Sequence, residues 1–123
     1  MIEVKLIGFV PDELLPIWMN ACDVFILPNL SEGNPMVMFE CLCREKPVVV
    51  TINGGSEEII TSEDYGLLCE PASPEELVEK ILIALDKEWD YENIRNYAEM
   101  FRWENIAKEI LEIYMAVTWE ASK

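Results

Sequence analysis

The sequence predicts an α/β domain built around a parallel sheet. Short runs rich in β-branched and aromatic residues alternate with helical segments along the first part of the chain, and such alternation is typical of βα units. Residues 46–52 contain a continuous run of β-branched residues, Val48 to Ile52, rather than an alternating pattern, which suits a parallel strand covered on both faces. From Ser73 onward the pattern is entirely helical. We therefore expect right-handed crossovers between strands, followed by a helical C-terminus.

The expected elements follow in order. Pro16 falls near the start of the first predicted helix, where proline costs little. Ser73, Pro74 and Glu76 form a capping box that marks a later helix start. Strands are predicted at 4–10, 23–27, 46–52 and 65–69, and helices at 11–21, 35–44, 57–60, from 73, 91–100 and 103–117.

The C-terminal helices carry apolar residues at helical spacing, which predicts that each packs through one face. Trp103 and Tyr114 lie at this spacing in the last helix, and we expect them to be packing residues. The predicted stripes are Leu77, Val78, Ile81, Leu82 and Leu85 in one helix and Ile106, Ala107, Ile110, Ile113, Tyr114 and Val117 in the last.

Length and charge limit the classes of function. The 123 residues suit a single domain, residues 1–123, that buries roughly two thirds of its unfolded surface. The net charge of −15 would repel a phosphate backbone, so nucleic acid is not an expected partner. No apolar run approaches the roughly 20 residues of a membrane span, and the N-terminus lacks a signal-peptide pattern. We expect a soluble cytoplasmic protein.

Metal and redox chemistry have little support. The four cysteines include no C-x2-C pair, and no histidine is present to complete a zinc site. We expect no metal and no cofactor, and we interpret the cysteines as small buried hydrophobes. Without histidine, acid–base chemistry would fall to carboxylates, Lys, Tyr or a group from another chain.

The most informative stretch is residues 30–40. Asn34 is a good N-cap and Pro35 suits the first helical position. The helix that follows is apolar on nearly every side, which predicts that it is buried, yet it contains Glu40. A carboxylate there must be paired, solvated in a cleft or bound to something. A second carboxylate, Glu32, lies eight residues earlier.

Topology predicts where these residues meet. The loops at 28–34 and 53–56 both follow strands, and ligands of parallel sheets bind at the carboxyl ends of strands. We therefore expect Glu32, the helix start at Asn34 and the pair Gly54–Gly55 around one crevice.

Each of these groups has a second interpretation. The helix start could bind a phosphate, hydroxyl or carboxylate, or be an ordinary capped helix. Glu40 could hold two vicinal hydroxyls, or pair with Lys46 or another nearby cation. Glu32 could accept hydrogen bonds from sugar hydroxyls or be a solvated loop residue. Gly54 and Gly55 could approach a ligand or form a turn that requires positive φ.

Together these residues resemble a known pattern. Glu32-x7-Glu40, within residues 27–37, looks like the signature of retaining glycosyltransferases of the GT-B fold, the "glycosyl transferases group 1" family. The resemblance extends in order over nearly the whole chain. The further matching segments are residues 8–11, 21–25, 46–49, 54–60 and 65–71, and Trp103 at the start of the last helix.

The resemblance implies a Rossmann-like three-layer α/β/α domain with a short, mostly parallel sheet, and it implies a donor site for a nucleotide-sugar. Glu40 would bind the ribose hydroxyls, and Glu32 would be the catalytic residue that contacts the transferred sugar. The chain would be the later part of the C-terminal donor domain. Backbone amides around Gly33, Asn34, Met36 and Val37 would bind the sugar or diphosphate, and Gly54 and Gly55 would also line the site.

The departures from the family are informative. Complete members are much longer, and an N-terminal domain holds the acceptor. An earlier part of the C-terminal domain supplies the Arg and Lys for the diphosphate, and neither rim loop here contains a Lys or Arg. The usual Gly before Lys46 is Glu45 in this chain.

These departures set the expected partners and activity. We expect the chain alone to be inactive and to need an N-terminal domain on another chain, and membrane association only through such a missing domain. The alternative is a stand-alone, non-catalytic module that binds a nucleotide-sugar or oligomerises. Exposed apolar surface on a truncated domain predicts a homo-oligomer.

Overall fold

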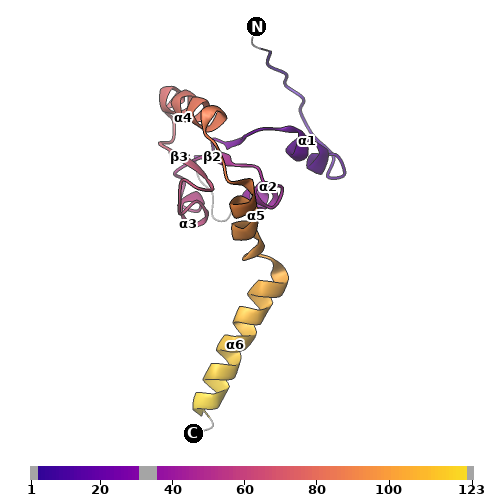
Figure 1. Ribbon diagram of the computed structural model, residues 1–123, viewed down its shortest axis with the longest axis vertical. Helices are drawn as coiled ribbons and strands as arrows, with labels where there is room; N and C mark the ends of the chain where they lie inside the picture. Colours follow the sequence, from indigo (N-terminus) through magenta and orange to yellow (C-terminus); the bar gives the residue numbers. More distant parts are fainter. Residues whose placement is uncertain (1–2, 31–35, 122–123) are drawn as a thin grey trace.

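The computed structural model describes residues 3–30 and 36–121, and its elements follow the predicted alternation (Figure 1). The three strands are β1 (Phe25–Leu27), β2 (Val48–Thr51) and β3 (Gly66–Cys69). The helices are α1 (Leu15–Ala21), α2 (Met36–Cys43), α3 (Ser56–Ile59), α4 (Pro74–Asp86), α5 (Tyr91–Glu99) and α6 (Trp103–Ala121).

The sheet has the order β1-β2-β3, and both pairings are parallel. All four residues of β2 are buried, as expected for a strand covered on both faces. Figure 1 shows α4 on one side of the sheet and α2, α3 and α5 on the other. The predicted α/β class and three-layer, Rossmann-like arrangement are therefore confirmed.

Local sequence patterns correctly predicted where some elements begin. The Ser73 hydroxyl accepts a hydrogen bond from the Glu76 N–H at 3.4 Å, so α4 begins at its predicted cap. Trp89 is buried after α4 and donates its indole N–H to the Ala84 carbonyl at 2.9 Å. Tyr97 of α5 stacks on Tyr65, with ring centroids 3.7 Å apart, and its hydroxyl donates to the Ile59 carbonyl. These contacts hold the helical half against the sheet.

The predicted strand at residues 4–10 is wrong. This segment has no regular secondary structure, and Leu6 and Phe9 are 98% and 89% exposed. Figure 1 shows it running away from the sheet. A strand needs a neighbour to satisfy its N–H and C=O groups, and no described residue pairs with this segment. Its β-branched composition is therefore not enough to form a strand.

The first helix is shorter than predicted. It begins at Leu15 rather than at residue 11, with Pro16 in its first turn. A proline ring clashes with the carbonyl four residues earlier, so a helix starting at 11 would place Pro16 in its interior. The preceding residues instead form a turn, in which the Leu14 N–H donates to the Pro11 carbonyl at 2.9 Å.

The predicted packing of the last helix is also wrong. No residue of α6 is buried, and Trp103 and Tyr114 are 73% and 67% exposed. In α4, Leu77 and Ile81 pack against the core, whereas Val78, Leu82 and Leu85 are exposed. Helical spacing correctly identified residues that share a face, but nothing in the described residues covers these particular faces.

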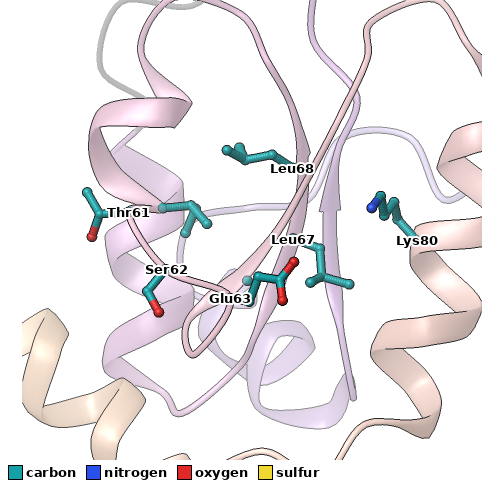
Figure 2. Close-up of a pocket in the computed structure, with 8 residues that line it drawn as sticks. Thr61, Ser62, Glu63, Leu67, Leu68 and Lys80 are labelled. Carbon is teal, nitrogen blue, oxygen red and sulfur yellow. The ribbon is translucent and has the colours of Figure 1, made fainter.

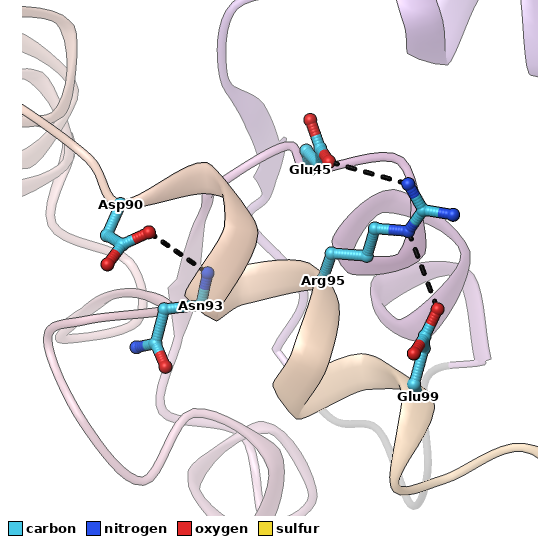
Figure 3. A network of polar contacts seen from close by, with 5 residues as sticks. All are labelled: Glu45, Asp90, Asn93, Arg95 and Glu99. Carbon is cyan, nitrogen blue, oxygen red and sulfur yellow. Dashed lines mark hydrogen bonds and ion pairs between the residues drawn. The ribbon is translucent and has the colours of Figure 1, made fainter.

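Helix α2 ends in a turn that places Glu45 in the left-handed backbone region. The Lys46 N–H donates to the Cys41 carbonyl and the Glu45 N–H to the Leu42 carbonyl, both at 3.0 Å, which is the Schellman pattern. Glu45 occupies the position that favours glycine and has φ of 63°. Its carboxylate lies 3.8 Å from Arg95, which also contacts Glu99 at 3.5 Å (Figure 3).

Replacing Glu45 tests the strain at this position. Glu45→Gly removes the left-handed strain, whereas Glu45→Ala keeps it, and both lose the same exposed ion pair with Arg95. We expect the glycine variant to be more stable than the alanine variant by about 1 kcal/mol. Urea denaturation of the two variants measures this difference. Equal stabilities would show that φ at residue 45 carries no strain.

Candidate functional site

The carboxyl ends of β1 and β2 are joined by one buried hydroxyl. Thr51 ends β2 and is 3% exposed. Its Oγ1 donates to the Asn29 carbonyl and lies 3.5 Å from the Leu27 carbonyl. The loop after β1 is therefore held at the same edge as the end of β2, as the parallel topology predicted. Sequence reasoning did not single out Thr51, although it is the first hydroxyl residue after the three valines of β2.

Helix α2 begins at this edge and presents Glu40 to solvent. Met38, Cys41 and Leu42 have no exposed surface, whereas Met36, Glu40 and Cys43 lie on an exposed stripe. The expectation of burial on every side was therefore wrong. The Glu40 carboxylate forms no ion pair or hydrogen bond with another described residue, so the alternative of pairing with Lys46 does not hold in the structure. Glu40 is a solvated carboxylate.

The loop after β2 is an internally bonded turn. Gly54 has φ of 101°, so its glycine is needed for the turn itself. The Gly54 N–H donates to both oxygens of the Glu57 carboxylate, at 3.0 and 3.2 Å. Asn53 Oδ1 accepts from the N–H groups of Gly55 and Ser56, at 3.2 and 3.0 Å. These backbone donors are occupied, so this loop presents other atoms to a ligand.

The bonding of this loop also affects Glu57. The hydrogen bond from Gly54 lowers the pKa of the Glu57 carboxyl below its ordinary value. The charged form is therefore the one that holds the turn. The charged Glu57 carboxylate therefore contributes to the stability of the folded state at pH values above its lowered pKa. This contribution is lost as the pH falls through that pKa and the carboxyl becomes protonated.

A pocket of about 380 Å³ lies between α2, α3 and the start of α6. It brings Met36, one of the predicted site residues, next to Glu58 and Ile59, which follow the Gly54–Gly55 turn. Val37 is half-buried against the core. The remaining lining residues are Phe39, Phe101, Trp103 and Ile106. The predicted residues Glu32, Gly33 and Asn34 lie outside the described residues.

A second pocket, of about 200 Å³, opens at the carboxyl ends of all three strands. Pro28 and Leu30 follow β1, Thr51 ends β2, and Glu70 follows β3. Among the described residues that line these two pockets there is no Lys or Arg. The edge of the sheet predicted to bind a ligand is therefore apolar and acidic.

A third pocket is unrelated to this edge. Figure 2 shows it beside β3, with Thr61, Ser62 and Glu63 on one side and Lys80 of α4 on the other. Residues 60–63 precede β3, so the pocket lies toward the amino end of that strand. It contains none of the residues that the sequence pattern predicted.

The cysteines follow the predicted role in part. Cys41 and Cys69 are buried, and burial raises the pKa of the Cys41 thiol to about 12 and that of Cys69 above its ordinary value. Cys43 is exposed, because it shares the outer stripe of α2 with Glu40. No group of three metal-binding side chains occurs among residues 3–30 and 36–121. Within the same ranges, no helix is long and apolar enough to cross a membrane.

Replacing Thr51 tests the connection between the two strand ends. Thr51→Val keeps the shape of the side chain but removes the hydroxyl that donates to the Asn29 carbonyl. We expect a loss of about 1 kcal/mol in the free energy of unfolding, the usual value for one hydrogen bond. The exposed Thr61→Val is the matched control and should change stability by less than about 0.5 kcal/mol. Urea titrations that gave equal midpoints for the two variants would contradict this role.

Comparisons with known proteins identify the family of this chain. Residues 2–101 match the family "Glycosyl transferases group 1". The chain is 31% identical over 116 residues to an uncharacterized glycosyltransferase of Methanocaldococcus jannaschii, and this match covers 91% of the chain but 33% of the relative. The chain thus spans about a third of that protein.

Solved structures give the same result for the fold. A sucrose-phosphate synthase of Thermosynechococcus elongatus superposes with a TM-score of 0.77 at 26% identity, covering 94% of this chain and 30% of that one. The C-terminal domain of a group 1 glycosyltransferase of Francisella tularensis gives a TM-score of 0.67 at 23% identity, over 77% of this chain and 51% of that one. The chain therefore belongs to the group 1 glycosyltransferase family and has the GT-B C-terminal domain fold.

Proposed function

We propose that this chain is the donor-binding part of a glycosyltransferase that moves a sugar from a nucleotide-sugar to an acceptor with retention of configuration. The observation that carries this proposal is Glu40. It is a solvated carboxylate without an ion pair among the described residues, on a helix that begins at the carboxyl edge of the sheet. A structural role in the core would instead bury or pair this group.

The residue roles follow the family resemblance. The two oxygens of the Glu40 carboxylate suit a pair of vicinal hydroxyls, as on a ribose, and charged acceptors form the stronger hydrogen bonds. Glu32 is assigned to the transferred sugar. The amides of Gly33, Asn34, Met36 and Val37 are assigned to the sugar or diphosphate, since a helix start favours anions. Gly54 and Gly55 border the site through their turn.

Charge indicates what this chain needs from a partner. A nucleotide diphosphate carries negative charge, and the described pockets at the carboxyl edge offer Glu58 and Glu70 but no cation. The net charge of −15 adds to the repulsion. Cations and the acceptor site would therefore come from the other two thirds of the enzyme, in the same or another polypeptide. We propose residues 1–123 as one domain of that assembly, in the cytoplasm.

The same lack of cations favours a second candidate. A chain without the groups that neutralise a leaving diphosphate could bind a nucleotide-sugar weakly without transferring it. Assays of sugar transfer with and without an added N-terminal glycosyltransferase domain separate the two candidates. Restored transfer supports the first, whereas binding without transfer in both cases supports the second.

Replacing Glu40 tests the donor site directly. Calorimetric titration with UDP-glucose and GDP-mannose should show weak binding by the parent chain. Glu40→Gln should weaken it by about tenfold or more, because a hydrogen bond to a charged acceptor is worth about 1.5–3 kcal/mol.

The exposed carboxylate of Glu79, on α4, provides the matched control. Glu79→Gln makes the same change of charge and should bind like the parent. Absence of parental binding at high millimolar ligand would contradict a donor site in the isolated chain. Equal binding by both variants would remove Glu40 from the site.

A further inference from the structure

Two buried hydroxyl groups lie on either side of the Gly54–Gly55 turn. Thr51 is 3% exposed and Ser56 has no exposed surface, whereas the other hydroxyl side chains among the described residues are half-buried or exposed. A buried hydroxyl costs free energy unless it forms a hydrogen bond. Because neither group is accessible to a ligand, we expect each to act on the protein itself.

The acceptors of these hydroxyls lie on the two sides of residues 30–36. The Thr51 hydroxyl donates to the carbonyl of Asn29, which directly precedes this stretch. The Ser56 hydroxyl donates to the Sδ atom of Met38 at 3.6 Å, in the first turn of α2. Met38 has no exposed surface, so its side chain is held in the core. The two contacts therefore fix the chain before and after this stretch.

The turn between the two hydroxyls sets their spacing. Asn53 Oδ1 accepts from the N–H groups of Gly55 and Ser56, at 3.2 and 3.0 Å. Thr51 is itself fixed by its place in the sheet, where it pairs with Cys69 of β3. The connection from β2 to α3 therefore holds both hydroxyls at fixed positions relative to the sheet.

We propose that Thr51 and Ser56 are positioning residues of the donor site. This inference rests on the proposed function, because the stretch between their two contacts contains Glu32, Gly33 and Asn34, which are assigned to the sugar and the diphosphate. Each hydroxyl touches the protein rather than the donor. Together they determine where the two ends of this stretch lie.

The direction of a hydrogen bond is what an apolar side chain would not supply. Valine has the shape of threonine and would fill the same space, but it would leave the Asn29 carbonyl without the Thr51 donor. Hydrogen bonds weaken steeply outside a range of about 2.7–3.2 Å. In catalysis, a displacement of about 1 Å can cost about a hundredfold in rate. Small shifts at Asn29 or Met38 are therefore enough to weaken the binding of a donor between them.

Calorimetric titration with UDP-glucose and GDP-mannose tests the positioning role. Thr51→Val and Ser56→Ala should each weaken binding by about threefold to fivefold, and the double variant by about tenfold or more, as expected for the loss of one or two hydrogen bonds. Thr51→Ser keeps the hydroxyl and should bind within about twofold of the parent. Equal binding by the double variant and the parent would overturn the proposal.

Trp89→Phe is the matched control for a general loss of stability. The Trp89 indole N–H donates to the Ala84 carbonyl at 2.9 Å, beyond the sheet edge that carries the donor stretch. This variant therefore also loses one buried hydrogen bond, but one that involves neither end of residues 30–36. It should bind both nucleotide-sugars like the parent. Weakening equal to that of Thr51→Val would overturn the proposal.

A measurement without ligand separates this inference from the proposed function. NMR order parameters of the backbone N–H groups of Leu30 and Met36 report how firmly the two ends of the stretch are held. Both should fall in the double variant and keep their parental values in Trp89→Phe. Unchanged values in the double variant would overturn the positioning role, even where the parent binds a nucleotide-sugar. A fall in both values without any binding by the parent would support the positioning role and contradict the proposed function alone.

Discussion

The structure depends on the complete burial of β2. Val48, Val49 and Val50 have no exposed surface, and this strand lies between β1 and β3 with helices on both faces. A one-residue shift would reverse the two faces of the strand and move Thr51 away from the loop after β1. Pairing with β3 is also constrained, because a Cβ at Gly66 would lie 2.4 Å from the Val48 carbonyl oxygen. The fixed register of β2 therefore determines where the loops of the candidate site lie.

The sequence predicted those parts of the fold that local physics determines. The valines of β2 and the cap at Ser73 each carry their own signal, and both elements formed where expected. The two wrong predictions, of a strand at residues 4–10 and of a packed last helix, share one cause. Whether residues 4–10 pair as a strand, or whether Tyr114 is covered, depends on surfaces elsewhere, and periodicity identifies a face without saying what lies against it.

The candidate site was predictable to a similar extent. Topology correctly brought the loops after β1 and β2 to one edge, but the spacing of apolar residues suggested that the helix carrying Glu40 is buried on nearly every side. The structure exposes Glu40, because only three residues of α2 are fully buried and they lie on the other side of the helix. The role of Thr51 could not be predicted from the sequence, because its hydrogen-bond acceptors are backbone carbonyls that only the fold brings near it. Glu32, Gly33 and Asn34 fall outside the described residues.

Among the described residues, no strand pairs with the outer edge of β1, and the backbone groups on that edge can be identified. The Phe25 N–H donates to the Pro47 carbonyl at 3.1 Å, toward β2. Because peptide groups alternate in direction along a strand, the N–H and C=O of Ile26 face the other way, and no described strand meets them. In deuterated water, the exchange rate of the Ile26 amide hydrogen therefore reports whether another strand is paired with β1. This hydrogen exchanges quickly in the isolated domain and slowly once another strand joins the sheet.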